Sequence, residues 1–386
     1  MTRQVQDPSA VDPRLDTQLY EYRIVARVAD GAMGRVYEGK HISSGARVAI
    51  KVLHPEVTQD AVAVERFRRE FETAESFDHP YIVRVVGFGS TTDGADFMVM
   101  EYLEGKELSL RLRERGALPP EEFLRIAAQV ALALEHAHSF GVIHRDLKPE
   151  NIFLCDSPEG PIVRVLDFGS VKLQVETGPK LTTFGTTLGS PYYMSPEQAL
   201  GRRDVDQRSD VFALAAIVYE MATGRTAFEG ESVGEILMKI MNDQPTSPRI
   251  LQPSLPPRFE DVVDRGLAKD KQRRFATATE LADALLQSFG LQGGAALWAP
   301  RSLQEFAIGL EDARSERARQ ESASAKVPES YDTTDAFRTA SPTAPRSSAP
   351  PSAASLPSSG KGRYRIVGAA IALGLVGFAL WAAGLF

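Results

Sequence analysis

The spacing of apolar residues divides a folded region of the chain, residues 22–290, into two parts. Apolar runs at residues 48–52 and 97–100 predict strands in the first part, residues 22–103. Helical spacing occurs there once, over residues 64–76. We therefore expect a small lobe built mainly from strands.

The second part, residues 104–290, is dominated by helical spacing. Pro119 and Pro120 open a helix that Gly141 closes. Ser209 is placed to cap a segment that is apolar on nearly all sides, which predicts a central buried helix. A strand-rich lobe followed by a helical lobe is an α+β, two-lobed fold.

The segments outside this region have different patterns. Residues 1–21 are polar and predict a flexible N-terminus, while residues 321–365 are rich in Ser, Ala and Pro and predict a disordered linker. Residues 291–320 predict a charged helical extension that either packs back on the domain or pairs with another copy. Its apolar stripe consists of Leu303, Phe306 and Leu310.

The last segment, residues 366–386, contains no charged residue. As a helix it is about 30 Å long, which matches a bilayer core and favours a transmembrane helix over a buried core helix. Lys361, Arg363 and Arg365 precede it, so the positive-inside rule places the folded domain in the cytoplasm. We expect a single-pass protein of the cell membrane without an outer domain, in which small residues of the span permit a homodimer.

The composition indicates a globular domain and argues against some classes of function. Hydrophobic residues make up 43% and charged residues 25% of 386 residues, as in soluble globular domains. The net charge of −7 argues against a general nucleic-acid binder, which is usually basic. The single cysteine, Cys155, excludes an intramolecular disulfide and is interpreted as a buried structural thiol.

Candidate chemistry begins with Gly31 and Gly34, whose spacing predicts a turn with backbone N–H groups that can approach phosphates. Residues 35–41 then predict a strand, which excludes Rossmann and Walker-type loops because those are followed by a helix. Lys51 ends an apolar strand and needs an anionic partner. Glu70, beside the inward face of the next helix, is a candidate.

A polar run between apolar segments contains Asp146 and Asn151, and Asp167 follows a predicted strand at residues 163–166. Two carboxylates and an amide at the ends of buried segments can hold Mg²⁺ and leave one carboxylate to accept a proton. Each motif is weak alone, but their order along the chain is specific: glycine loop, lysine, glutamate, His-Arg-Asp with lysine and asparagine, then Asp-Phe-Gly.

In this order the motifs resemble those of protein kinases over residues 22–290, specifically the bacterial membrane-anchored, eukaryotic-like (Hanks-type) serine/threonine kinases. The resemblance implies ATP and Mg²⁺ as cofactors and protein Ser/Thr residues as substrates. The implied catalytic residues are Asp146, Lys148, Lys51 and Glu70. The implied magnesium ligands are Asn151 and Asp167. The implied ATP-binding residues are Val28, Ala29, Gly31, Gly34, Val36, Ala49, Lys51, Met100, Glu101 and Leu103.

The resemblance also implies a regulatory role for Arg145, because kinases with this arginine are commonly switched by phosphorylation and phosphate can dock on arginine. The candidate phosphorylation sites are Thr182, Thr183, Thr186 and Thr187. They lie in the implied activation segment, the stretch from the Asp-Phe-Gly motif to Glu197. An ion pair of Glu197 with Arg274 is implied, as is a role for Asp210 in holding the backbone of the catalytic loop.

The chain departs from the kinase pattern at Ala29 and Ala215, where glycine is expected, but neither change removes a catalytic group. The alternative function is a pseudokinase scaffold that binds nucleotide or partners without turnover. Such scaffolds usually lack the lysine, the catalytic aspartate or the Asp-Phe-Gly motif, and this chain retains all three. His136 and His138 lie two residues apart on a helix, so they do not share a face and a metal site is disfavoured.

Overall fold

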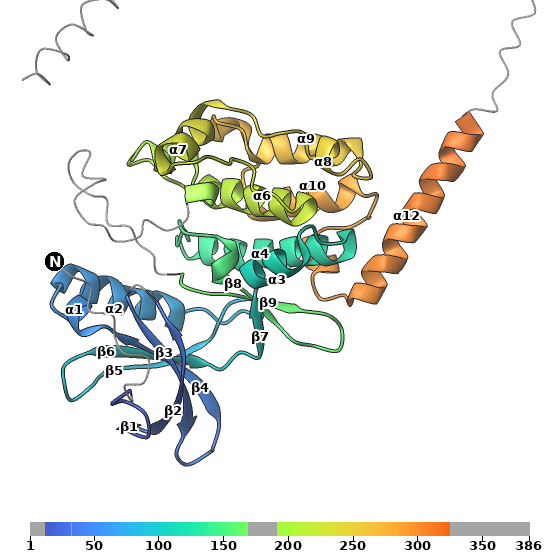
Figure 1. The fold of residues 1–386 in the computed structure, drawn as a ribbon. Coiled ribbons are helices and arrows are strands. Elements are labelled where there is room, and N and C mark those ends of the chain that lie inside the picture. Colours follow the sequence, from blue (N-terminus) through green and yellow to red (C-terminus); the bar gives the residue numbers. More distant parts are fainter. Residues whose placement is uncertain (1–11, 32, 169–190, 325–386) are drawn as a thin grey trace, which may run out of the picture. The chain divides into compact units, whose positions relative to one another are not determined.

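The computed structural model describes residues 12–31, 33–168 and 191–324, which form a two-lobed fold (Figure 1). The described N-terminal lobe contains a six-stranded antiparallel sheet in the order β1-β2-β3-β4-β6-β5. Its strands are β1 (Gln18–Leu19), β2 (Tyr22–Asp30), β3 (Gly34–His41), β4 (Arg47–Leu53), β5 (Val85–Ser90) and β6 (Asp96–Glu101). The expected strands at 48–52 and 97–100 are confirmed as parts of β4 and β6.

Alternation along β4 explains how this strand presents Lys51. Val48, Ile50 and Val52 are buried on one face of the sheet. Since successive side chains of a strand point to opposite faces, Ala49 and Lys51 lie on the other face. Burial of one face therefore fixes the direction of the lysine.

Helices α1 (Pro55–Thr58) and α2 (Ala61–Glu75) connect β4 to β5. The Asp60 side chain accepts hydrogen bonds from the backbone N–H groups of Val62 and Ala63, so α2 begins three residues before the predicted start. Phe67 of α2 packs against Phe88 of β5 with ring centroids 5.9 Å apart. This contact fixes the face of α2 that carries Glu70.

A second, three-stranded antiparallel sheet consists of β7 (Gly105–Glu107), β8 (Ile152–Cys155) and β9 (Ile162–Val165) in that order. Between β7 and β8 the sequence contains helices α3 (Leu108–Arg115) and α4 (Pro120–Ser139). The sheet confirms the strand expected at 163–166. Val165 N–H donates to the Tyr81 carbonyl at 2.8 Å, and Val83 N–H donates to the Val165 carbonyl at 3.0 Å. Strand β9 therefore joins the two lobes directly before Asp167.

The C-terminal lobe is helical, as predicted. Its described helices are α3 (Leu108–Arg115), α4 (Pro120–Ser139), α5 (Pro196–Ala199), α6 (Arg208–Thr223), α7 (Val233–Asn242), α8 (Pro248–Leu251), α9 (Pro257–Gly266) and α10 (Ala278–Ser288), with single 3₁₀ turns at η1 (Pro149–Asn151), η2 (Pro191–Tyr193) and η3 (Lys271–Arg273). Helix α6 is the central buried helix, but the predicted cap is wrong. Gln207 is the N-cap, and Ser209 is the second residue of the helix. The Ser209 hydroxyl group donates to Glu197 at 2.6 Å instead of capping the helix.

The alanine at position 215 has a packing explanation. It lies where α6 crosses α9, and a Cβ placed on Gly266 would come within 2.6 Å of the Ala215 Cβ. Gly266 therefore supplies the space that Ala215 needs at this crossing.

The C-terminal extension forms α11 (Ala295–Trp298) and α12 (Leu303–Ser324). Phe306 and Leu310 are buried, and Phe306 packs against Trp298 with ring centroids 4.9 Å apart. The first part of α12 thus packs back on the domain, while its C-terminal end projects from the helical lobe (Figure 1).

No helix among the described residues is long and apolar enough to cross a membrane. The predicted span at residues 366–386 lies outside the described part, as do the N-terminal residues 1–11 and the linker from residue 325 onward. The four candidate phosphorylation sites in the activation segment also lie outside it.

Candidate active site

A charged cluster lies where three elements meet. Lys51 Nζ of β4 is 3.0 Å from Glu70 Oε1 of α2 and 3.0 Å from Asp167 Oδ1 after β9. The Lys51 and Glu70 side chains are 15% and 10% exposed, whereas that of Asp167 is 40% exposed. The structure therefore brings these three predicted residues together and leaves Asp167 as the most open member.

Burial and mutual attraction set the charges of this cluster. Burial opposes the charged form of Lys51, but the carboxylates of Asp167 and Glu70 outweigh it and raise the pKa of the ammonium group. Burial raises the pKa of Glu70 to about 7 against the opposing attraction of Lys51. For Asp167 burial also acts upward, but the Lys51 ammonium group lowers its pKa. Asp167 is therefore anionic, which is the form that binds a cation.

The predicted catalytic loop is the polar run that contains Asp146 and Asn151. Its backbone is held by the buried carboxylate of Asp210, as predicted. Asp210 accepts the backbone N–H of His144 and of Arg145, each at 2.9 Å, and its Oδ2 lies 2.8 Å from His138 Nε2. Burial acts to raise the pKa of Asp210, but the hydrogen bond to His138 helps to bring it below the usual value. Arg145 has φ of 63°, a left-handed conformation that these bonds support.

Asp146 and Lys148 form the accessible end of this loop. Lys148 Nζ is 2.8 Å from Asp146 Oδ2, and their side chains are 18% and 28% exposed. Asn151 Nδ2 donates to the Asp146 carbonyl at 2.8 Å, which leaves the amide oxygen as an acceptor. An open carboxylate held beside a lysine is suited to accept a proton from a bound hydroxyl group.

The donor set fits magnesium shared with a phosphate ligand. Mg²⁺ prefers oxygen ligands and is usually held by one or two carboxylates together with waters and substrate phosphates. Asp167 offers a carboxylate and Asn151 an amide oxygen. Within the described part of the chain, no group of three or more His, Cys, Asp or Glu side chains is placed to hold a metal by itself.

The glycine turn connects β2 to β3. Gly31 N–H donates to the Gly34 carbonyl at 2.9 Å, and a Cβ on Gly34 would lie 2.2 Å from the Val52 carbonyl oxygen, so only glycine fits at position 34. His54 Nε2 is 2.9 Å from the Gly31 carbonyl oxygen and 3.1 Å from Asp30 Oδ1. His54 tethers the turn and was missed in the sequence because it belongs to no motif.

Strand register gathers five of the predicted ATP-binding residues. Ala29 pairs with Val36, Val36 with Lys51, and Ala49 with Met100. Directly paired residues share a face, as do residues two apart in one strand, so all five lie on the sheet face of Lys51. That face is less buried than the opposite one, as a ligand-binding face should be.

The remaining predicted ATP-binding residues lie around this face. Val28 is 54% exposed on β2, beside a register shift between Arg27 and Ala29. Glu101 ends β6, and its side chain accepts from the Arg84 backbone N–H at 2.9 Å. Leu103 is half-buried in the connection from β6 to β7.

His144 and Phe168 support Asp167 and were not predicted as functional, although both belong to recognised motifs. His144 Nε2 is 3.0 Å from the Leu166 carbonyl oxygen, and its ring centroid is 4.9 Å from that of Phe168. Phe168 also packs edge-on against Phe77 at 5.3 Å. These contacts hold the residues on each side of Asp167, which itself has φ of 55°.

The histidines of α4 do not share a site, as expected. His138 contacts Asp210, whereas His136 stacks on His79 with ring centroids 4.9 Å apart. Cys155 is half-buried rather than fully buried, and burial raises the pKa of its thiol to about 11. The thiol is therefore protonated, which agrees with a structural and unreactive cysteine.

The predicted ion pair of Glu197 with Arg274 is present and fully enclosed. Two guanidinium nitrogens bond two carboxylate oxygens at 2.7 and 2.8 Å, and the side chains are 3% and 0% exposed. Burial acts to raise the pKa of Glu197, but hydrogen bonds from Arg274 and Ser209 lower it to about 2. This pair fastens α5 to the segment before α10.

The sequence matches the protein kinase domain family over residues 22–286. The chain belongs to the protein kinase family. The two-lobed kinase fold is therefore confirmed, and the glycine turn, the Lys51 cluster and the loop held by Asp210 lie within the matched region. The extension from residue 291 onward lies beyond the matched region.

Its relatives include bacterial serine/threonine kinases. The chain is 39% identical over 267 residues to serine/threonine-protein kinase pkn3 of Myxococcus xanthus, covering 68% of this chain and 49% of that protein. It is 36% identical over 260 residues to PrkC of Bacillus subtilis, covering 67% and 39%. This chain therefore matches about half or less of the length of these curated relatives.

Solved structures agree with the fold. The kinase domain of PknI from Mycobacterium tuberculosis is 29% identical, with a TM-score of 0.57, and the match covers 71% of this chain and 98% of that domain. The kinase domain of this chain is thus similar in fold to that of a bacterial kinase.

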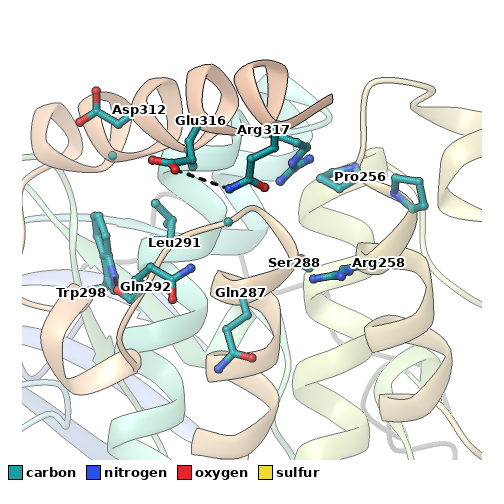
Figure 2. A pocket seen from close by; sticks show the side chains of 15 residues that line it. Pro256, Arg258, Gln287, Ser288, Leu291, Gln292, Trp298, Asp312, Glu316 and Arg317 are labelled. Atoms are coloured by element: carbon teal, nitrogen blue, oxygen red, sulfur yellow. Dashed lines mark hydrogen bonds between the residues drawn. The ribbon is translucent and has the colours of Figure 1, made fainter. Parts of the chain in front are cut away.

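A separate groove of about 840 Å³ lies between α12, the start of α9 and the end of α10. Figure 2 shows Asp312, Glu316 and Arg317 of α12 above it, with Arg258 and Gln287 from the other helices. None of the predicted site residues lines this groove, so it is distinct from the kinase site.

Proposed function

We propose that the chain is an ATP- and Mg²⁺-dependent kinase that transfers phosphate to serine and threonine residues of proteins, including its own activation segment. The single observation that carries this proposal is the Lys51 cluster, in which Nζ lies 3.0 Å from both Glu70 and Asp167. Lysine, glutamate and the Asp-Phe-Gly aspartate occupy the arrangement that phosphoryl transfer requires.

In this proposal each residue has one task. Lys51, positioned by Glu70, neutralises nucleotide phosphates, while Asn151 and Asp167 hold the metal. Bound Mg²⁺-ATP supplies the phosphoryl group and the charge neutralisation for its transfer. Asp146 then orients a substrate hydroxyl group and accepts its proton, and Lys148 stabilises the negative charge beside it.

We place the kinase in the cell membrane through residues 366–386, with the domain in the cytoplasm. The length and apolarity of that segment and its basic flank support this placement. Phosphorylation of one of the four activation-segment threonines would act through Arg145, which precedes Asp146 and bonds to Asp210 through its backbone. A homodimer paired through the span is the corresponding oligomer.

The test is autophosphorylation of the purified full-length chain with Mg²⁺-ATP, with Asp146→Asn beside it and phosphosites mapped by mass spectrometry. We expect labelling of wild type on Ser/Thr and at least a hundredfold less in Asp146→Asn, since a positioned base contributes about 10²–10⁴-fold. A chain that binds ATP without labelling itself or any protein would support the pseudokinase scaffold instead. Retention of the full-length chain in washed membranes, and its loss on deleting residues 366–386, tests the anchor.

A further inference from the structure

The strand that leads to Asp167 has one edge without a strand partner along part of its length. In β9, Val165 bonds to the segment of Tyr81 and Val83 in the N-terminal lobe. Val163 lies two residues earlier on the same edge, and no strand among the described residues pairs with it there. Its buried N–H needs an acceptor from elsewhere.

Gln129 of α4 supplies that acceptor. Its Oε1 accepts the Val163 N–H at 2.8 Å, and its Nε2 donates to the Ala299 carbonyl at 2.8 Å. The Gln129 side chain is buried, with the residue 1% exposed. One amide therefore bridges β9 and the connection between α11 and α12, and this connection lies beyond the matched kinase region.

Two further contacts join the same parts. The buried guanidinium of Arg125, one turn before Gln129 on α4, donates to the carbonyls of Pro161 and Arg301. Leu303 N–H donates to the Glu159 carbonyl at 3.0 Å. Residues 299–303 are thus bound to the β8–β9 hairpin at three points, all within eight residues of Asp167.

We propose that Gln129 is a positioning residue for phosphoryl transfer: it couples the extension at Ala299 to the strand that sets the place of Asp167. This inference rests on the proposed role of Asp167 in holding magnesium. A residue of purely structural value would only stabilise the fold, whereas a positioning residue also changes how well the metal is held in folded protein.

The experiment compares full-length wild type with Gln129→Met, which keeps length and volume but removes both hydrogen bonds. The matched control is Thr223→Val, because Thr223 is also buried and its hydroxyl group bonds only within residues 219–225. Thermal unfolding identifies a temperature at which all variants are folded. The initial rate of autophosphorylation is then measured against Mg²⁺ concentration at saturating ATP.

We expect Gln129→Met to need up to about tenfold more Mg²⁺ for half-maximal rate. Groups bonded directly to metal ligands have effects of about 10–100-fold, and Gln129 acts on Val163, four residues before Asp167. Thr223→Val should match wild type. Without metal or nucleotide, hydrogen exchange of the peptide spanning residues 162–167 should be faster in Gln129→Met and unchanged in Thr223→Val. Leu303→Ala loosens the contact with Gly160. It should raise the Mg²⁺ requirement and the exchange rate of residues 162–167 by smaller amounts than Gln129→Met does. It provides the test if Gln129→Met does not fold.

The proposal is overturned if Gln129→Met, or Leu303→Ala in its place, shows the Mg²⁺ dependence of Thr223→Val, even if its hydrogen exchange at residues 162–167 is faster. That result would leave Gln129 with a structural role alone. Failure of the proposed function looks different, because wild type itself would then show no Mg²⁺-dependent labelling, or Asp167→Asn would retain it.

Discussion

Two clusters in this molecule combine carboxylates with a single cation, and they differ in how completely the charges are matched and enclosed. The Glu197–Arg274 pair is balanced and closed, with Ser209 and backbone carbonyls completing its hydrogen bonds. The cluster around Lys51 is unbalanced, since one cation faces two carboxylates and one of these is 40% exposed. The first arrangement has no capacity for a ligand, whereas the second has an excess negative charge at an open end and suits a metal with its phosphate.

Arg274→Met should give the largest difference between the two clusters, as a loss of stability at the closed pair. It leaves Glu197 buried without its cation, which should cost about 3–5 kcal/mol of the free energy of unfolding. Chemical denaturation measures this loss. The double variant Arg274→Met/Glu197→Leu should recover most of it, because no buried charge then remains. A loss below about 1 kcal/mol in Arg274→Met would show that the closed pair is not a stabilising element.

Lys51→Met should have the opposite effect: a large loss of activity and little loss of stability. We expect the autophosphorylation rate to fall by about 10²–10³-fold, the usual effect of removing one preorganised electrostatic group. The melting temperature should change little, because a neutral Glu70 is already accessible at pH 7 through its raised pKa. Lys40→Met, at an exposed position on β3, is the control. A large loss of stability in Lys51→Met would contradict the distinction between the two clusters.

The dependence of stability on acidic pH tests the charge of Glu197 in the closed pair. The pKa of Glu197 in the folded protein is about 2, below its unfolded value near 4.5. Its contribution is therefore complete above pH 4.5 and is lost as the pH falls toward 2, with a total of about 3 kcal/mol. Denaturation of wild type and Glu197→Gln between pH 6 and 3 checks this. The stability of wild type should fall more steeply than that of Glu197→Gln, and equal slopes would refute the assignment.

The sequence predicted the motif residues of the candidate site better than the residues that hold the surrounding backbone in place. The motif residues Lys51, Glu70 and Asp167 could be found because phosphoryl transfer restricts their types and order. His54 and Gln129 could not, because any polar side chain of suitable length can satisfy a backbone group, and only the fold shows which groups lack a partner. Ser209 was placed correctly in a helix but given the wrong role, since its hydroxyl group bonds to Glu197, twelve residues away in sequence.

The two-lobed fold was predictable from the change of apolar spacing. The observed element boundaries differ from the predicted ones by a few residues where capping residues decide them. The packing of the extension at residues 291–320 was not predictable. Its stripe of Leu303, Phe306 and Leu310 suited either the domain or a second copy, and the choice depends on Trp298, whose ring packs against Phe306. Such complementarity between distant surfaces has no periodic signal in a sequence.

Glu70→Gln should give the smallest effect and tests the open cluster by pH. Burial raises the pKa of Glu70 to about 7, above its unfolded value of about 4.5, so the folded protein binds this proton more tightly. The contribution of Glu70 to stability is therefore complete below pH 4.5 and is lost as the pH rises through 7. Between pH 5 and pH 8 this loss amounts to about 2.5 kcal/mol in wild type. Relative to wild type, Glu70→Gln should therefore gain about 5–10 °C in melting temperature over that range. A gap that stays constant, or that moves the other way, would mean that Lys51 keeps Glu70 ionised throughout and that burial does not raise the pKa of Glu70.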